Sequence, residues 1–508
     1  MFNKIKSGTI YGLRSFLIDV EVDFSQGLPC FAMVGSLKSE VKESAERVRV
    51  ALKNMGIAIP PMHVAVNLSP ADTKKSGTGF DVPIVLAVLM CLGKIDPEEY
   101  KDTLVIGELG LDGEIKRVNG TMPIVWEAKK ASIKRCIVPI ENIEEASMVD
   151  GIEVISYESL SALLRNEPYK TSDEAISKLY SDNDIHTDFA DIIGQESLKR
   201  GALIAVAGFH HILMMGPPGT GKSMIAKRIP TIFPPLSLED SMDVTAIYSI
   251  AGMLDKNTPV IKTAPFVSPH HTVTANGISG GGMIPKPGAV SLAHKGVLFL
   301  DELPEFNRQT LDMLREPLEN KQINLSRATG SFNYPADLML VAAMNPCPCG
   351  YYPDFNKCNC SPITIKHYLS HISGPLLDRI DICLTAHKIK INQLVTLENN
   401  KITDGMANSK KMLESVNRAR AIQFERFKAD HIKYNSEMDV KAINKYCKLT
   451  NKDKLSLEKM CDKMEISARG YHRMLKVSRT IADLEESEEI KWEHVLEAMS
   501  YRPQLPGC

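Results

Sequence analysis

The stretch HILMMGPPGTGKSMIAKRI, residues 211–229, decides the fold class of this 508-residue chain. An apolar run at 212–215 leads into GPPGTGKS, and a helical pattern follows. This is the P-loop spacing in its required strand–loop–helix context, because glycines let backbone N–H groups surround phosphate oxygens at a helix N-terminus. The alternative, a plain Gly/Pro turn before an ordinary helix, is disfavoured by the match at every position. The sequence therefore predicts an α/β nucleotide-binding domain.

The candidate nucleotide ligands are the eight residues of this loop. They are Gly216, Pro217, Pro218, Gly219, Thr220, Gly221, Lys222 and Ser223. Lys222 is expected to reach the β and γ phosphates of a nucleotide, and the Ser223 hydroxyl to bind Mg²⁺.

An acidic pair further along the chain supplies the second half of the predicted site. Asp301 and Glu302 follow the apolar run 297–300, which reads as a buried strand. Asp301 is expected to hold Mg²⁺ through water, and Glu302 to orient and deprotonate the attacking water. Alone, such a pair is often a solvated loop, but its combination with a P-loop favours catalysis.

Composition restricts the class of protein. The chain has 44% hydrophobic and 24% charged residues, typical of globular domains, and its net charge of −2 demands no nucleic-acid partner. Any contact with DNA must therefore come from local basic patches. Residues 1–16 lack the apolar segment of a signal peptide, and no run of 18 apolar residues occurs. We expect a multi-domain cytoplasmic protein without a membrane span.

The pattern along the chain divides it into four regions. These are an α/β unit at 1–165, a polar linker at 166–187, a second α/β unit at 188–388 and a helical region at 389–508. In the first region, alternation predicts strands at 15–24 and 63–70. Apolar spacing there predicts a helix over 41–56, which Gly56 closes.

Three further polar residues fit a nucleotide-hydrolysing site. Asn345 ends the apolar run 338–344, where its amide is expected to position the attacking water. Arg379 follows a short apolar helix and is expected to reach the γ-phosphate of a neighbouring subunit, as an arginine finger does. Arg473, with Arg469 as the alternative, lies on a C-terminal helix where a second arginine would contact the nucleotide. A surface salt bridge is the competing interpretation for each arginine.

Four of the 11 cysteines fall in one short segment, NPCPCGYYPDFNKCNCSP at 345–362. They are Cys347, Cys349, Cys358 and Cys360. In a reducing compartment this clustering favours a tetrahedral Zn²⁺ site over disulfides, and four sulfurs leave no open position for catalysis. The expected role is a knuckle that stiffens the loop after Asn345. A redox pair and unliganded thiols remain the alternatives.

Two insertions are candidates for contact with DNA. The Gly/Pro-rich segment 270–296 carries Lys286 and Lys295, and 321–338 reads as a β-hairpin with Arg327 beside its turn. Such cations would bind the phosphates of DNA irrespective of its base sequence. Ordinary flexible loops are the alternative. The neighbouring histidines at 270 and 271 are expected to point apart on a strand, so no metal pair is predicted there.

Several motifs together resemble the YifB/ComM family of magnesium-chelatase-like AAA+ ATPases, over essentially the whole chain. They are DIIGQ at 191–195, GPPGTGKS, LFLDELPEF, AAMNPCPCG, GPLLDRIDI and RGYHRMLKVSRTIADL. The resemblance implies an N-terminal Lon-protease-like domain, an AAA+ core and a helical C-terminal lid, with Ile193 and Gly194 near the adenine. It also implies a homo-hexameric ATP-driven motor on DNA, with helicase-like branch migration of incoming DNA during natural transformation.

The chain departs from these patterns at three places. Val267 stands where the family often has an arginine in P-F-R-[SA]-P-H-H. In the Lon-like region, Gly79 takes the place of the nucleophilic serine and Met122 lies near the place of the lysine base. A Ser–Lys protease dyad needs both partners, so the sequence predicts a fold retained for DNA binding or assembly.

Two other functions compete with a DNA motor. A protein-remodelling ATPase of the magnesium-chelatase motor type would use the same core on a protein client. A scaffold that binds ATP without turnover is disfavoured, because Lys222, Asp301, Glu302 and Arg379 are all present.

Overall fold

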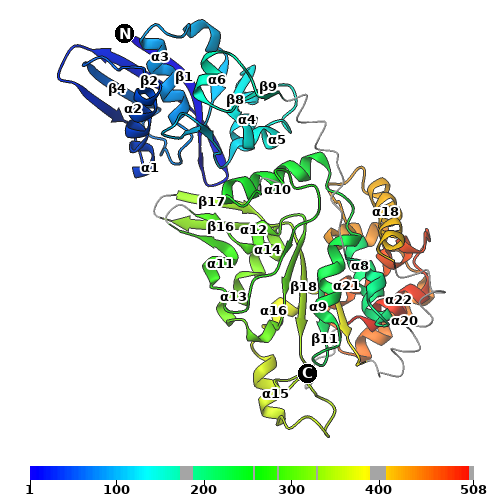
Figure 1. Cartoon of the computed structure of the whole chain (residues 1–508). Coiled ribbons are helices and arrows are strands. Elements are labelled where there is room, and N and C mark those ends of the chain that lie inside the picture. Colours follow the sequence, from blue (N-terminus) through cyan, green and yellow to red (C-terminus); the bar gives the residue numbers. More distant parts are fainter. Residues whose placement is uncertain (172–186, 256–257, 283–284, 328–329, 389–407, 503–508) are drawn as a thin grey trace.

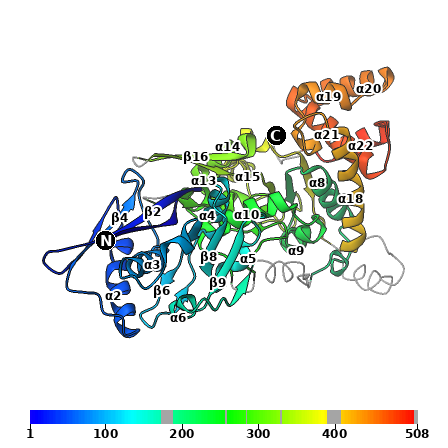
Figure 2. The ribbon, with the colours of Figure 1, turned by 90° about the horizontal axis from the view of Figure 1, so that it is seen from above.

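A computed structural model describes residues 1–171, 187–255, 258–282, 285–327, 330–388 and 408–502. It contains an N-terminal α/β unit, a central α/β core and a C-terminal helical unit (Figure 1). Seen from above, the N-terminal and C-terminal units lie on opposite sides of the core (Figure 2). No helix among the described residues is long and apolar enough to cross a membrane.

The N-terminal unit is built on an eight-stranded mixed sheet with the order β10-β9-β8-β5-β1-β2-β4-β3. Its elements are β1 (Phe2–Tyr11), β2 (Arg14–Ser25), β3 (Cys30–Val34), α1 (Ser39–Lys42), α2 (Ser44–Asn54), β4 (His63–Ser69), α3 (Asp81–Cys91), β5 (Thr103–Val105), β6 (Glu108–Leu109), β7 (Ile115–Lys116), α4 (Thr121–Lys130), β8 (Arg135–Pro139), α5 (Ile143–Ala146), β9 (Glu153–Tyr157), α6 (Leu160–Leu164) and β10 (Lys170–Thr171). The strands predicted at 15–24 and 63–70 are confirmed as β2 and β4. Alternation works here because one face of each strand joins the hydrophobic cluster that contains α3, a helix buried along its whole length.

Two predictions about this unit need correction. The helix expected over 41–56 is divided at Glu43 into α1 and α2, although the inward positions Val48 and Leu52 are fully buried as expected. The boundary at residue 165 is too early, because β10 pairs with β9, and Lys170 Nζ lies 3.2 Å from Glu144 Oε1. The rest of the predicted linker, 172–186, lies outside the described residues.

The core is organised by a five-stranded, all-parallel sheet with the order β12-β15-β18-β11-β19. Its elements are α8 (Glu196–Gly208), β11 (Ile212–Met215), α9 (Lys222–Arg228), α10 (Leu238–Ala251), β12 (Phe266–Val267), α11 (Ala275–Ser279), β13 (Gly280–Gly281), β14 (Lys286–Pro287), α12 (Ala289–Leu292), β15 (Val297–Leu300), α13 (Arg308–Met313), α14 (Arg315–Asn320), β16 (Gln322–Arg327), β17 (Gly330–Pro335), β18 (Met339–Met344), α15 (Pro362–Leu369), α16 (Gly374–Leu377) and β19 (Ile382–Thr385). The apolar runs of the sequence are β11, β15 and β18. Parallel strands bring their carboxyl ends to one edge of the sheet, so the polar residues after these strands meet there.

The expected β-hairpin at 321–338 is confirmed as the antiparallel pair β16–β17. Its turn residues Ala328 and Thr329 lie outside the described residues. The hairpin contacts the N-terminal unit, because the rings of Tyr11 and Phe332 are 5.1 Å apart. A second contact joins the unit to α10, where Ser249 Oγ donates to the buried carboxylate of Glu145 at 2.6 Å. The N-terminal unit therefore rests on both the hairpin and α10 (Figure 1).

The C-terminal unit is entirely helical in its described part, as predicted, and 389–407 lie outside it. Its helices are α18 (Ser409–Arg426), α19 (Val440–Tyr446), α20 (Asn451–Lys463), α21 (Ala468–Leu484) and α22 (Trp492–Ser500). Val416 of α18 and Ile481 of α21 belong to the same hydrophobic cluster as Ile212 of β11. The helices and the nucleotide-binding sheet thus share one core.

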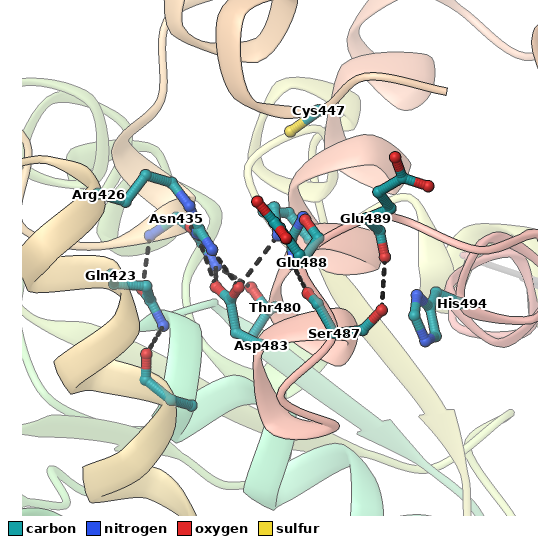
Figure 3. A network of polar contacts seen from close by, with 12 residues as sticks. Gln423, Arg426, Asn435, Cys447, Thr480, Asp483, Ser487, Glu488, Glu489 and His494 are labelled. Carbon is teal, nitrogen blue, oxygen red and sulfur yellow. Dashed lines mark hydrogen bonds and ion pairs between the residues drawn. The ribbon is translucent and has the colours of Figure 1, made fainter. Parts of the chain in front are cut away.

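A buried polar network fixes these helices to one another (Figure 3). Asp483 Oδ2 accepts hydrogen bonds from Arg426 at 2.8 Å and from Asn435 at 2.7 Å, and Arg479 Nε lies 3.0 Å from Asp483 Oδ1. The network reaches the core through Thr480, whose Oγ1 lies 2.8 Å from His210 Nε2. Because a buried charge needs partners, these bonds fix the position of the C-terminal unit on the core.

Candidate nucleotide site and metal centre

The P-loop joins the end of β11 to the start of α9. Gly219 and Gly221 have φ of +75° and +84°, left-handed conformations that favour glycine. Gly216 lies against the backbone of Ala386 at the end of β19, where a Cβ would come within 2.5 Å of a carbonyl oxygen. Thr220 Oγ1 donates to the Pro217 carbonyl at 2.9 Å. The loop thus has the tight turn that directs N–H groups at the N-terminus of α9 towards an anion.

Lys222 lies at the centre of this loop. Its Nζ donates to the carbonyls of Gly216 at 2.7 Å and Pro217 at 3.0 Å, and to Asn345 Oδ1 at 3.3 Å. Burial lowers the pKa of Lys222, and the nearby Asp301 carboxylate opposes that shift. The structure therefore brings Lys222 and Asn345 into direct contact, although they are far apart in the sequence.

The predicted magnesium ligands also meet. Ser223 Oγ donates to Asp301 Oδ2 at 2.6 Å. A hydroxyl and a carboxylate at a P-loop are the hard oxygen ligands that Mg²⁺ takes together with nucleotide phosphates. Asp301 also accepts a hydrogen bond from the backbone N–H of Glu302 at 3.0 Å, which fixes its carboxylate.

Glu302 has a partner that the sequence analysis missed. Its backbone has φ of +53°, and its Oε2 lies 3.5 Å from His271 Nδ1. The expectation that His270 and His271 point apart is wrong: their ring centroids are 4.1 Å apart. The two residues lie in a turn after β12 rather than on a strand, so the alternation of strand side chains does not apply.

The segment predicted to lie near the adenine borders the P-loop. Ile193 and Gly194 are half-buried and precede α8. The next residue, Gln195, donates from Nε2 to the Thr220 carbonyl at 3.0 Å and to the His387 carbonyl at 2.7 Å. This amide joins the segment before α8 to the P-loop and to the strand end of β19.

The two arginines predicted to act on the nucleotide lie side by side, around a cavity of about 500 Å³ that Arg469 also lines. Arg379 pairs with the Glu319 carboxylate and donates to the Pro375 carbonyl at 2.7 Å, and its buried Nε has no hydrogen-bond partner. Both hydrogen bonds of Arg473 go to the backbone that flanks Arg379. They reach the carbonyls of Leu377 at 3.1 Å and Ile380 at 2.5 Å. The two guanidinium groups thus belong to one face of the chain.

The four clustered cysteines converge as their spacing indicated. The Sγ atom of Cys347 lies 3.3 Å from that of Cys349 and 3.7 Å from that of Cys358. All four Sγ atoms lie within 4.8 Å of one another. Thiolates at 2.3 Å from a tetrahedral Zn²⁺ ion would be about 3.8 Å apart. A hydrogen bond from the Tyr351 backbone lowers the pKa of Cys349 to about 7, whereas desolvation and the neighbouring thiols raise the pKa of Cys358 and Cys360. All four thiols, Cys360 included, are free of disulfides, so this donor set fits a metal ion.

The residues predicted to contact DNA have different environments. Lys286 is exposed in β14, and Arg327 is the last residue of β16, next to undescribed turn residues. Lys295 is largely buried, and its Nζ lies 2.9 Å from Asp337 and 3.3 Å from Asp240. Burial opposes its charge, but the two carboxylates outweigh burial and raise the pKa of Lys295. Lys295 is therefore a structural ion-pair partner rather than a free cation.

A parallel sheet with these side chains at its carboxyl edge has the architecture of a P-loop core of the AAA+ type. Family comparisons agree. The chain matches the family described as "Subunit ChlI of Mg-chelatase" over residues 20–142. It matches "Magnesium chelatase, subunit ChlI" over 188–394 and "Magnesium chelatase, subunit ChlI C-terminal" over 406–502.

Individual relatives specify the family further. The chain is 38% identical over 500 residues to the competence protein ComM of Haemophilus influenzae. The matched region covers 97% of this chain and 96% of ComM. It is 39% identical over 499 residues to YifB of Escherichia coli K12, covering 97% and 95% of the two chains. The 38 kDa magnesium-chelatase subunit of Rhodobacter capsulatus is 26% identical over 174 residues, 31% of this chain and 50% of that protein. The chain belongs to the YifB/ComM family of magnesium-chelatase-like AAA+ ATPases.

Proposed function

We propose that this chain is an ATP-hydrolysing motor that assembles as a homo-hexamer and drives branch migration, a helicase-like activity on recombining DNA. The observation that carries the ATPase function is the convergence of Lys222, Ser223, Asp301 and Asn345 at one edge of the sheet. The role in DNA uptake is supported by the competence protein that matches the chain from end to end.

The geometry supports the following roles in hydrolysis. The N–H groups of the P-loop and Lys222 would bind the phosphates, and Ser223 and Asp301 would hold Mg²⁺, which would supply positive charge beside them. Asn345, held by Lys222, orients the attacking water beside the γ-phosphate. Glu302 accepts the proton of that water as the oxygen attacks phosphorus and ADP leaves.

The position of the arginines supports the proposed hexamer. The hydrogen bonds of Arg379 and Arg473 go to the segment 375–380 and to Glu319, and not to the P-loop of the same chain. In a ring, this face meets the nucleotide of the next subunit, where cationic groups stabilise the charge that develops on the transferred phosphoryl group. In this proposal the site is complete only between two copies.

Replacing His271 with alanine should lower the turnover number of ATP by between about threefold and tenfold without changing KM, because Glu302 loses the group that orients it. The measurement is steady-state phosphate release. His270→Ala is the matched control, since the His270 ring bonds to Thr272 and not to Glu302. Equal losses in both variants would show that the turn, and not the His271 contact, matters.

We assign the DNA contacts to the insertion around Lys286 and to the β16–β17 hairpin, where Arg327 is the last residue of the first strand. Cations there would bind phosphates irrespective of sequence, on single-stranded or branched DNA, and the affinity should fall steeply with salt. The N-terminal unit supports the hairpin through the contact of Tyr11 with Phe332. A movement of the hairpin on DNA would therefore be transmitted to the N-terminal unit through this contact.

DNA is expected to stimulate ATP hydrolysis. The test compares turnover with no DNA, single strands, duplex and a four-way junction at low salt and at concentrations that allow hexamers. Lys286→Ala should reduce the stimulation and lower the salt dependence, whereas Lys452→Ala, an exposed lysine of α20, should not. Turnover indifferent to every DNA would contradict the motor function.

The N-terminal unit is proposed to be a Lon-protease-like fold without protease activity. Gly79 carries no nucleophile, and Met122 is buried. Lys75 and Ser76, which lie close by in the sequence, do not form a substitute dyad. Ser76 Oγ donates to the Ile10 carbonyl at 3.2 Å, and Lys75 Nζ donates to the Pro70 carbonyl. With neither group bonded to the other, the unit serves DNA binding or assembly.

The cysteine cluster is proposed to hold a structural Zn²⁺ ion in the reducing cytoplasm. Four sulfurs complete a tetrahedron, so the metal would have no catalytic position. One zinc ion per chain in the purified protein, measured by elemental analysis, is the expected result.

A protein-remodelling ATPase is the second candidate. It is favoured by the partial likeness to the 38 kDa magnesium-chelatase subunit. DNA-independent turnover that a protein client stimulates would establish it in place of the DNA motor.

A further inference from the structure

The four-cysteine loop, residues 347–360, lies directly against the P-loop. Gly350 has φ of +84°, and a Cβ there would lie 2.6 Å from Cδ of Pro218 and 3.7 Å from Cγ of Asn345. The Pro218 ring is rigid, so this contact cannot relax by rotation of a side chain. The backbone at Gly350 therefore sets how closely the loop and the P-loop approach.

Asn345 directly precedes this loop and has contacts through both its side chain and its backbone. On one side, Asn345 Oδ1 accepts a hydrogen bond from Lys222, the central P-loop lysine. On the other, the backbone of Asn345 interacts with the phenolic oxygen of Tyr368 in α15, the helix that begins just after Cys360, and this interaction opposes the rise in the pKa of Tyr368 that burial causes. The cysteine loop thus connects Asn345 to α15.

Backbone hydrogen bonds within the loop, an ion pair between Lys357 and Asp354, and the contacts among the sulfur atoms hold the loop in this shape. The Gly350 N–H donates to the Cys347 carbonyl at 2.9 Å, and the Tyr352 N–H donates to Cys347 Sγ at 3.4 Å. The large side chain of Phe355 is 77% exposed, so it adds little to an apolar core. A metal bound by the four sulfurs would join the two ends of this loop and so add to these bonds.

We propose that the Zn²⁺ ion held by the four cysteines is part of the nucleotide-binding machinery. It fixes Gly350 against Pro218 and keeps Asn345 on Lys222, so the affinity for ATP depends on the metal although the metal touches neither nucleotide nor water. This inference rests on the proposed ATP site and the proposed zinc ion. It is independent of DNA, of hexamers and of any client.

The sharpest test alters the contact and leaves the thiols intact. Gly350→Ala should retain one zinc per chain and weaken binding of a fluorescent ATP analogue at least about tenfold, because the added methyl pushes the P-loop away. Gly77→Ala is the control, with a similar φ of +87° but no atom within 4 Å of the added methyl. Adding Pro218→Ala to Gly350→Ala should recover most of the affinity, since it removes the ring atoms that clash. Unchanged affinity in Gly350→Ala, or no recovery in the double variant, would overturn the coupling.

The metal is tested separately. Removal with a zinc-selective chelator, or Cys358→Ser, should weaken binding of the same analogue at least about tenfold, and added Zn²⁺ should restore the chelated protein. Cys447→Ser, a buried thiol of the C-terminal unit, is the control, and circular dichroism shows that each variant is folded. A folded, zinc-free chain that binds the analogue as tightly as the loaded chain would overturn the inference alone. A zinc-loaded chain that binds no nucleotide would overturn the proposed ATPase function as well.

Discussion

Glu302→Gln should abolish ATP turnover while nucleotide still binds. Glutamine has almost the same shape but cannot take a proton from the attacking water, and loss of a general base costs about 10²- to 10⁴-fold in rate. In the proposed site, the phosphates are bound by the P-loop and Lys222, whose contacts with the loop carbonyls the substitution does not touch. We therefore expect the kcat to collapse and the Kd of a fluorescent ATP analogue to stay within about twofold.

The matched control is Glu305→Gln, which removes the same charge from an exposed residue in the same turn. It should leave the kcat unchanged. If Glu302→Gln retained more than a tenth of the wild-type rate, Glu302 would not be the general base. Loss of nucleotide binding in Glu302→Gln would instead show that the carboxylate supports the fold of the site.

The second large effect concerns Arg379, whose replacement by alanine should lower turnover by about 10³-fold or more. The residue lies beside Arg473 on a face that a ring would present to the neighbouring nucleotide. Removing its charge leaves the transition state without the group that reaches it from the next subunit. Arg315→Ala, a partly exposed arginine of α14, is the control and should stay active.

Mixing two inactive variants tests whether Arg379 acts between subunits. Arg379→Ala subunits keep Lys222, and Lys222→Ala subunits keep Arg379. In mixed rings, some interfaces therefore combine an intact nucleotide site with an intact arginine, and activity should return as the two proteins are titrated together. No recovery, in rings shown by mass to be mixed, would place the arginine in the nucleotide site of its own chain.

The parts of the site that could be predicted from sequence are those set by local pattern. β11, β15 and β18 are continuous apolar runs because parallel strands are buried on both faces, and the P-loop, Asp301 and Asn345 that follow these runs mark the edge of the sheet. The cysteine spacing likewise indicated a cluster, since residues two apart in a tight loop can converge. These features need only neighbouring residues to be recognised.

The parts that could not be predicted depend on which strands become neighbours. His271 faces Glu302 because β12 pairs with β15, and nothing in the spacing between the two residues indicates that pairing. Lys295 appeared free in a Gly-rich segment, yet the fold places it between Asp240 of α10 and Asp337 before β18. Contact between Gly350 and Pro218 is likewise a consequence of tertiary packing.

The hydrophobic cluster that contains both Ile212 and Ile481 decides how the protein can be divided for experiments. A fragment that stops at residue 388 would lack the C-terminal helices that cover the cluster around β11. Its apolar side chains would be exposed to water, which lowers the free energy of unfolding by about 25 cal/mol for each Å² exposed. The N-terminal unit has clusters of its own, although α10 adds Met242 and Ala246 to one of them. A fragment of residues 187–502 therefore keeps the helices that share the cluster around β11, but it loses Tyr11 and Leu13, which pack against a second cluster of the catalytic sheet.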